Sequence, residues 1–271
     1  MLHSEGAAVS GSSSASDAAW SYEHRIVPFA RPFAQSTVRL ALKAVAGVGR
    51  DPVVLDHGAG TGLVSNLLLD ARPSASIVAL DPNAELLNVL RPRERCECIV
   101  GTAADLAPGD RFDLVVSNLV LPFCSDAAGD LQIVRAAAHP GASLVITTLG
   151  TAESVTPFHR FWSSVQAVVP GGWSPTRYPH HRFGARPDFV GAVEAGGWTV
   201  ETVRPVRAVR RIRPAGAWAW LSAVLPVGVG DGYRTLSASE RADVQNDFLA
   251  QWSSENRWVS EGWTIVARSS K

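Results

Sequence analysis

Two carboxylates and a glycine-rich turn are the residues whose types and spacing best suit them to chemistry. An apolar run at residues 53–55 reads as a buried strand that ends in Asp56. Gly58, Gly60 and Gly62 follow it, and glycines there let a ligand approach the backbone closely. A helix predicted from about residue 61 points free N–H groups at the same place. A second apolar strand ends in Asp81, where doubly wound folds hold ribose hydroxyls.

The elements that must position these groups alternate between strand and helix. The apolar stretches predict strands at residues 53–56, 77–81, 96–101, 112–117, 144–149, 198–203 and 263–268. Helices are predicted between them, and Pro140-Gly141 is expected to form a turn. This alternation predicts a parallel sheet with right-handed crossovers. Two short helical patterns at residues 20–48 are expected to be interrupted at Pro28 and Pro32.

The alternation of predicted strands and helices is regular in one part of the chain and interrupted in others, and this divides the chain into segments. Residues 1–18 are rich in Ser, Ala and Gly and read as a disordered tail, and residues 19–271 as one domain. Within it we expect N-terminal cap helices, a cofactor-binding core and two insertions that line a substrate pocket. These segments are 19–49, 50–150, 151–184 and 212–238.

Composition narrows the classes of protein and partner. The chain carries 25 basic and 25 acidic residues, a balance that disfavours nucleic acid as a partner. The three cysteines Cys96, Cys98 and Cys124 form no disulfide or metal-binding pattern, so we expect thiols and no metal site. No apolar run is long enough to span a membrane, and no signal peptide is recognisable. We therefore expect a cytoplasmic protein, either a monomer or a homodimer.

A series of motifs carries a family resemblance across residues 50–150. The motifs are Asp56-x-Gly58-x-Gly60-Thr61-Gly62, Asp81, Gly101-Thr102-Ala103-Ala104-Asp105-Leu106, Phe112-Asp113-Leu114-Val115-Val116-Ser117-Asn118 and His139-Pro140-Gly141-Ala142. The series is similar to the class I S-adenosylmethionine-dependent methyltransferases, and most to the small-molecule branch of ubiquinone, menaquinone and natural-product enzymes. A nicotinamide dinucleotide site would need Gly-x-Gly-x-x-Gly, and here Gly62 comes one residue too early.

The resemblance implies a fold and a cofactor. The fold would be α/β, a Rossmann-like doubly wound sheet of seven strands whose last strand is antiparallel. The cofactor would be S-adenosylmethionine, with S-adenosylhomocysteine as product. Its binding residues would be Asp56, Gly58, Ala59, Gly60, Gly62, Asp81, Pro82, Thr102, Ala103, Asp105, Ser117 and Asn118.

Individual roles follow from the chemistry of the cofactor. Asp81 would accept hydrogen bonds from the ribose hydroxyls, and Asp56 would meet either the cofactor ammonium or the backbone of the turn. Thr102 stands where the family often has Asp, so the partner of the adenine amino group stays open, with Asp105 as a candidate. His57 is unusual at its position; a buried histidine bonded to a backbone carbonyl is expected there, and a role near the substrate is the alternative.

Histidines and aromatic residues supply the remaining candidates. A hydroxyl or carbon acceptor needs a base near neutral pH, and the candidates are His24, His159, His180 and His181, although the transfer can proceed without one. Aromatic walls suit a flat or apolar acceptor. The expected substrate-binding residues are Trp20, Tyr22, Trp162, Trp173, Tyr178 and Trp220.

The predicted function is methyl transfer to an O, C or N atom of a small, largely apolar or aromatic metabolite, in natural-product biosynthesis. One alternative is a cyclase or pericyclase that binds S-adenosylmethionine without methylating. Another is a non-catalytic sensor or scaffold. A nucleic-acid or protein methyltransferase is disfavoured, because Ser117-Asn118-Leu119-Val120 stands where such an enzyme would have Asn/Asp-Pro-Pro-aromatic.

Overall fold

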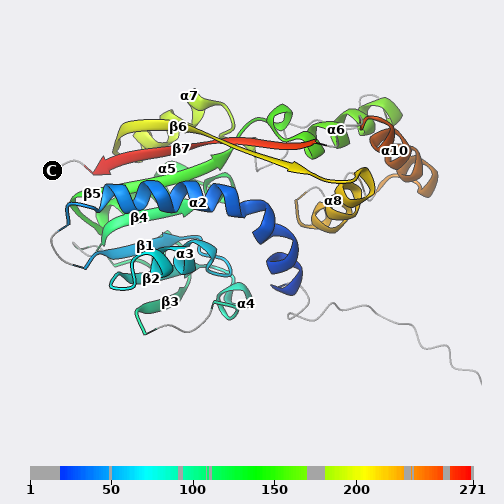
Figure 1. Cartoon of the computed structure of the whole chain (residues 1–271). Coiled ribbons are helices and arrows are strands. Elements are labelled where there is room, and N and C mark those ends of the chain that lie inside the picture. Colours follow the sequence, from blue (N-terminus) through cyan, green and yellow to red (C-terminus); the bar gives the residue numbers. More distant parts are fainter. Residues whose placement is uncertain are drawn as a thin grey trace, which may run out of the picture.

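The computed structural model contains a seven-stranded sheet at the centre of the chain (Figure 1). It describes residues 19–48, 51–90, 94–107, 109, 112–169, 181–228, 233, 235–252 and 257–269. The strand order is β3-β2-β1-β4-β5-β7-β6. The strands are β1 (Val53–His57), β2 (Ser76–Asp81), β3 (Cys96–Val100), β4 (Phe112–Asn118), β5 (Ala138–Leu149), β6 (Trp198–Arg211) and β7 (Arg257–Ser269). Strands β1 to β5 are parallel, and β7 is antiparallel to both neighbours, which confirms the predicted fold class.

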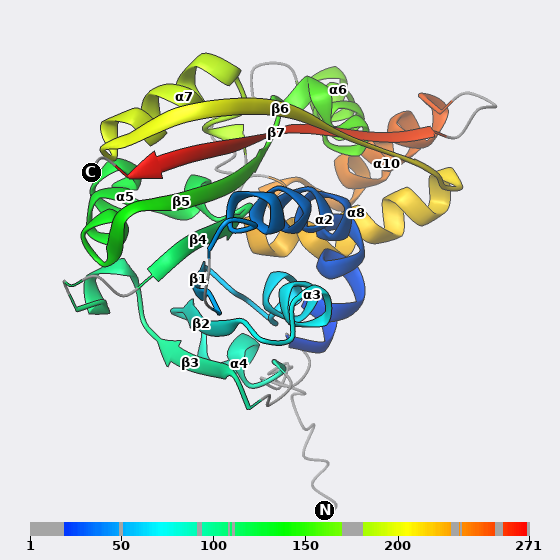
Figure 2. The same ribbon diagram turned by 60° about the vertical axis from the view of Figure 1, so that its left-hand side comes forward.

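Helices cover both faces of this sheet (Figure 2). The α-helices are α2 (Val27–Ala44), α3 (Leu63–Ala71), α4 (Ala84–Leu87), α5 (Ala127–Ala136), α6 (Thr156–Val168), α7 (Arg186–Ala195), α8 (Pro214–Gly228) and α10 (Ala238–Ala250). The alternation of side chains along β4 explains the two layers. Leu114 and Val116 pack with α2 and α3, whereas Val115 packs with α5 and α7. None of the described helices has the length and apolarity required to cross a bilayer.

A third cluster lies beyond the end of the sheet, where α6, α8 and α10 gather around the projecting part of the β6–β7 hairpin (Figure 1). Its buried side chains are mostly aromatic and include Phe158, Phe161 and Trp258. Strand β6 extends to Arg211, well past the predicted end at residue 203, because it pairs with β7 along its whole length. The hairpin thus carries the sheet into the region that the sequence assigned to insertions.

Two local predictions from proline were wrong. Pro140 and Gly141 lie inside β5, where a positive φ at Gly141 accompanies a register shift against β4. Pro32 does not interrupt α2, which runs on to Ala44. Pro32 lacks the N–H that would bond to the carbonyl of Pro28, and Arg210 Nη2 donates to that carbonyl instead.

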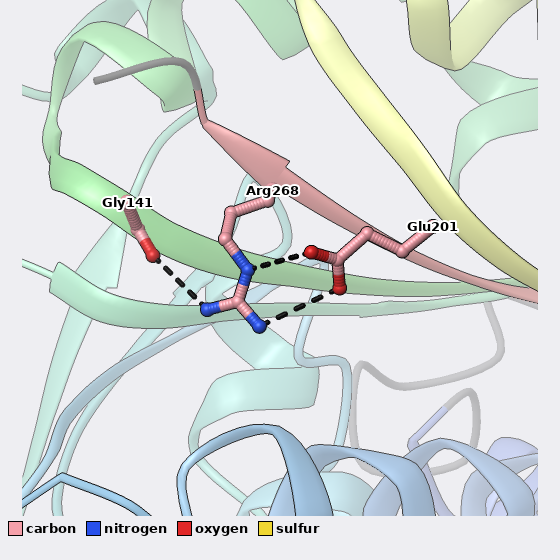
Figure 3. Close-up of polar contacts among 3 residues, drawn as sticks. All are labelled: Gly141, Glu201 and Arg268. Carbon is pink, nitrogen blue, oxygen red and sulfur yellow. Dashed lines mark hydrogen bonds and ion pairs between the residues drawn. The ribbon is translucent and has the colours of Figure 1, made fainter.

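The side chain of Arg268 on β7 forms hydrogen bonds with both neighbouring strands, β6 and β5. Arg268 on β7 donates from Nε to Glu201 Oε1 on β6 at 2.9 Å and from Nη1 to the carbonyl of Gly141 on β5 at 3.3 Å (Figure 3). The Arg268 and Glu201 side chains are 43% and 41% exposed, so the pair contributes little to stability. Its geometry fits the register in which β7 lies between β5 and β6.

Candidate active site

The glycine turn after β1 has the backbone conformation that its sequence predicts. Gly58, Gly60 and Gly62 have φ values of 74°, 56° and 80°, a region that other residues rarely adopt. The N–H groups of Gly58 and Ala59 donate to the carbonyl of Leu80 at 2.8 and 3.0 Å, which ties the turn to β2. A Cβ on Gly58 would lie 2.3 Å from a methyl carbon of Val120, so the turn also packs against the segment after β4.

Asp56 holds the turn and the helix that follows it. Its Oδ2 accepts hydrogen bonds from the backbone N–H of Ser65 at 3.0 Å and from the Ser65 hydroxyl at 2.6 Å. The Asp56 residue is 1% exposed, and burial raises the pKa of its carboxyl to about 6 although the Ser65 hydrogen bonds act in the opposite direction. Of the two expected roles for Asp56, the structure shows contact with backbone groups near the turn.

Asp81 lies beside the turn at the end of β2. Its Oδ2 accepts a hydrogen bond from the N–H of Gly60 at 2.8 Å, and its Oδ1 accepts one from the N–H of Asn83 at 2.9 Å. Pro82 lies between Asp81 and Asn83 in the chain, and the Asn83 side chain caps the N-terminus of α4. A carboxylate oxygen has two lone pairs, so each oxygen of Asp81 keeps capacity for one more donor.

The ends of β3 and β4 complete this edge of the sheet. After β3, the turn η2 (Ala103–Asp105) is closed by Asp105, whose Oδ2 accepts from the N–H of Thr102 at 2.8 Å. After Ser117, Asn118 ends β4, and its Oδ1 accepts a hydrogen bond from the Thr37 hydroxyl of α2 at 3.2 Å. Because β3, β2, β1 and β4 are neighbouring parallel strands, their carboxyl ends bring all the predicted cofactor residues to one edge.

An N-terminal π-helical turn, η1 (Tyr22–Ile26), covers the glycine turn. The Tyr22 hydroxyl lies 3.3 Å from the place that a Cβ on Gly60 would occupy. Burial, together with the charges of Asp81, Glu23 and Asp56, raises the pKa of Tyr22 to about 12. Glu23 Oε2 is buried and has no hydrogen-bond partner within the described part of the chain. A buried, partnerless carboxylate oxygen within a group of three carboxylates fits a cationic ligand such as a sulfonium with an ammonium group.

Comparisons with known proteins agree with this geometry. A family model described as a methyltransferase domain matches residues 54–141. A malonyl-[acyl-carrier protein] O-methyltransferase of Pseudescherichia vulneris is 29% identical over 65% of this chain and 69% of its own length. A trans-aconitate 2-methyltransferase of Azoarcus sp. is 30% identical over 52% of this chain and 55% of its own. Residues 54–141 of the chain are therefore a class I S-adenosylmethionine-dependent methyltransferase domain.

Solved structures show the same fold for this methyltransferase. A putative methyltransferase from Bacillus halodurans superposes with a TM-score of 0.57 at 17% identity, covering 85% of this chain and 99% of that one. The 1,6-didemethyltoxoflavin-N1-methyltransferase of Burkholderia thailandensis, solved with S-adenosylhomocysteine, has a TM-score of 0.52 at 17% identity. That match covers 95% of this chain and 87% of the other.

The histidine candidates of the methyltransferase lie in different surroundings. His24 is exposed and stacks on Trp20, with ring centroids 4.2 Å apart, and His159 is exposed on α6. His180 lies outside the described residues. His181 is placed at the end of β5, where its Nδ1 lies 2.6 Å from the carbonyl oxygen of Gly150. Burial lowers the pKa of His181, so its ring is neutral at pH 7.

The aromatic residues predicted to bind the substrate also lie in different surroundings. Trp162 is 5% exposed and packs in the cluster of α6, α8 and α10, whereas Trp20 is 56% exposed. Trp220 on α8 donates from Nε1 to the carbonyl of Arg25 in η1 at 2.8 Å, which joins this cluster to the turn that covers the predicted cofactor residues. Trp173 and Tyr178 lie outside the described residues.

Two features of the site go beyond the sequence-based reasoning. The structure places the Tyr22 hydroxyl beside Gly60 of the glycine turn, and the role in substrate binding that sequence reasoning assigned to Tyr22 stays a prediction. Sequence reasoning also gave no role to Leu119, which follows β4 with a φ of 64° and whose N–H donates to the carbonyl of Thr147 at 2.8 Å. A left-handed Leu is strained, and such strain is concentrated at functional sites. Nothing in the local sequence distinguishes Leu119 from its neighbours.

Proposed function

We propose that this methyltransferase transfers the methyl group of S-adenosylmethionine to an O, C or N atom of a small, largely apolar or aromatic metabolite in natural-product biosynthesis. The observation that carries the proposal is the position of the aromatic cluster beside the covered cofactor turn. Phe29 on α2 contacts Trp220, Phe158 and Trp258, with ring centroids 5.2, 6.5 and 5.9 Å apart. Trp220 in turn bonds to η1. An acceptor entering between η1 and this cluster would meet apolar walls.

The residues that would hold the cofactor are those at the carboxyl ends of β1 to β4. Asp81 would accept hydrogen bonds from the ribose, the backbone of the Gly58–Gly60 turn would lie along the methionine part, and Thr102 or Asp105 would face the adenine. Glu23 and Tyr22 would close over the cationic end. When bound, S-adenosylmethionine supplies a methyl carbon already activated by its sulfonium, so the protein's main task is to orient the acceptor.

Proton removal from a hydroxyl acceptor is the second task, and His181 is the best-placed described candidate. Its Nδ1–H donates to the carbonyl of Gly150, which fixes the tautomer in which Nε2 carries the lone pair. A neutral imidazole at the end of β5 would take the acceptor proton on Nε2 as the new bond to carbon forms. His159, which is exposed on α6, serves as the matched control for this role.

The cofactor part of the proposal is tested by calorimetric titration with S-adenosylmethionine and, separately, with NADH. We expect binding of the former only. Asp81→Asn should weaken it at least tenfold because hydrogen bonds to a charged group are lost, whereas Asp188→Asn, on the exposed first turn of α7, should not. Binding of NADH instead, or equal affinities for both variants, would contradict the assignment.

The acceptor part is tested with methyl-labelled cofactor and a panel of aromatic and terpenoid acceptors. Malonyl-acyl carrier protein and trans-aconitate belong in the panel because two relatives are named for them. We expect labelled product from an apolar acceptor, with kcat reduced by His181→Gln and unchanged by His159→Gln. Methylation of the two acids alone would refute an apolar acceptor. Cofactor binding with conversion of an acceptor but no label transfer would favour the cyclase alternative.

A further inference from the structure

Three side chains with metal-ligating atoms meet on the face of the sheet that α5 covers, beside the glycine turn. They are His57 at the end of β1, Cys124 after η3 (Leu121–Phe123) and Asp130 on α5. One potential ligand atom from each lies within 4.8 Å of the other two. His57 is 5% exposed, whereas Cys124 and Asp130 are half-buried, so the group has a buried side and a side toward solvent.

We propose that His57, Cys124 and Asp130 bind a zinc ion. The sequence predicted no metal site, because the three residues are far apart in the chain and follow no ligand spacing. Folding brings them together through the neighbouring positions of β1 and β4, since Ser117 of β4 lies next to His57 and the chain continues from there through η3 to α5.

The chemical types of the three ligand atoms indicate that the metal is zinc. Imidazole nitrogen, thiolate sulfur and carboxylate oxygen are the ligand types that zinc combines, whereas calcium and magnesium prefer oxygen alone. A thiolate and a carboxylate together neutralise a divalent charge, so the bound group would carry no net charge in this half-buried place. Tetrahedral zinc ligands lie roughly 3.4–3.8 Å apart, so binding would need the side chains to move inward by about 1 Å.

The surroundings position all three candidate ligands. His57 Nδ1 lies 3.3 Å from the Ser117 hydroxyl, not against the backbone carbonyl that the sequence predicted. Arg182 Nη1 donates to the carbonyl of Cys124 at 2.8 Å and so fastens that residue's backbone. Asp126 caps α5 by accepting from the N–H of Gly129 at 2.9 Å, which orders the first turn that carries Asp130. Hydrogen bonds around candidate ligands are what orient them in metal sites.

The site would act on the methyltransferase through the segment between Asn118 and α5. Val120 packs against Gly58 of the glycine turn. Cys124 follows Val120 in the same segment, and the Cys124 Sγ lies 3.9 Å from the Val120 carbonyl oxygen. An ion that joins Cys124 to β1 and α5 would hold this segment in place. Its role is therefore structural.

The test is a cobalt titration of the untagged full-length chain after removal of metals with a chelator. Cobalt replaces zinc in such sites and reports a thiolate ligand by a charge-transfer absorption in the near ultraviolet. We expect one equivalent of Co²⁺ to produce this absorption, together with the intense visible bands of a tetrahedral site, and one equivalent of Zn²⁺ to abolish both. Bound Zn²⁺ should also raise the melting temperature, because it binds only the folded state.

Three variants locate the site. Cys124→Ser should lose the charge-transfer absorption, and Asp130→Asn should keep it but weaken Co²⁺ binding at least tenfold. Cys98→Ser, at an exposed cysteine on β3, is the matched control and should behave like the unaltered chain. Circular dichroism establishes that each variant is folded.

Two results would overturn the proposal. One is the absence of the absorption in the unaltered chain at millimolar Co²⁺, which depends on no variant. The other is an unchanged absorption in Cys124→Ser, which would assign the thiolate to another cysteine. Calorimetry with S-adenosylmethionine on the same metal-free samples keeps the two proposals apart, since loss of cofactor binding would contradict the function and leave the zinc site untouched.

Discussion

Replacing Gly62 with alanine tests the packing beneath the cofactor turn, because the chain offers a matched control at Gly141. Both glycines have nearly the same backbone conformation, with φ values of 80° and 79°. A Cβ on Gly62 would lie 2.1 Å from Leu90 Cδ1 and 3.2 Å from Leu90 Cβ, whereas a Cβ on Gly141 would meet nothing within 4 Å. The two variants therefore share the cost of a left-handed alanine and differ in the steric clash.

The magnitudes follow from these two contributions. A left-handed alanine costs about 1–2 kcal/mol, so Gly141→Ala should lower the free energy of unfolding by about that amount. Overpacking a filled site costs about 1–3 kcal/mol more, which Gly62→Ala should show in addition. Because Leu90 is 4% exposed and packs with Ala79 and Leu87, it cannot move aside into solvent.

Guanidinium chloride unfolding of both variants measures the difference directly. A double-mutant cycle then tests the cause. Leu90→Ala removes the atoms that clash, so the cost of Gly62→Ala in that background should fall to the value for Gly141→Ala. Equal destabilisation by Gly62→Ala and Gly141→Ala in the unaltered background would refute the packing argument, and so would a cost that Leu90→Ala leaves unchanged.

Two further predictions concern the buried carboxyl and an arginine beneath the N-terminal helix. Because burial raises the folded-state pKa of Asp56 from 3.8 to about 6, the folded chain keeps a proton that the unfolded chain releases. Stability from this group is thus lost as the pH rises from about 4 to 6, and the stability of Asp56→Asn relative to the unaltered chain should increase by about 2 kcal/mol between pH 4 and 7. Urea unfolding at the two pH values checks this, and a constant difference would contradict the raised pKa. Arg210→Met should cost about 1–3 kcal/mol by leaving the carbonyl of Pro28, opposite Pro32 in the helix, without its donor, whereas Arg207→Met, which breaks an exposed ion pair, should cost less than about 1 kcal/mol. Equal melting temperatures for these two variants would show that the carbonyl is satisfied in another way.

The sequence by itself determined the sheet and the cofactor turn. The strand runs that end in Asp56 and Asp81 lie side by side as expected, because parallel strands with right-handed crossovers bring their carboxyl ends to one edge. The three glycines of the turn have positive φ, which is a local property of the backbone and so can be read from local residue types. The seven-stranded fold with its antiparallel last strand, which the family resemblance implied, was predicted correctly.

Local rules failed where a distant contact changed the outcome. Pro32 was expected to break the N-terminal helix, but Arg210 of β6, far along the chain, donates to the carbonyl that Pro32 leaves without a partner. Pro140-Gly141 was expected to form a turn, but β5 continues through it as an irregular stretch between the pairs Ala138–Phe112 and Ser143–Leu114. Arg268 of β7 donates to the Gly141 carbonyl there, a contact from a distant part of the chain.

Only the tertiary structure decided which side chains meet. It placed Tyr22 of η1 over Gly60, and it brought His57, Cys124 and Asp130 within 4.8 Å of one another. Residue type and spacing predict what a segment forms by itself, since helix and strand periods are local. Contacts between segments far apart in the chain depend on how whole faces pack, and that packing exists only once the chain has folded.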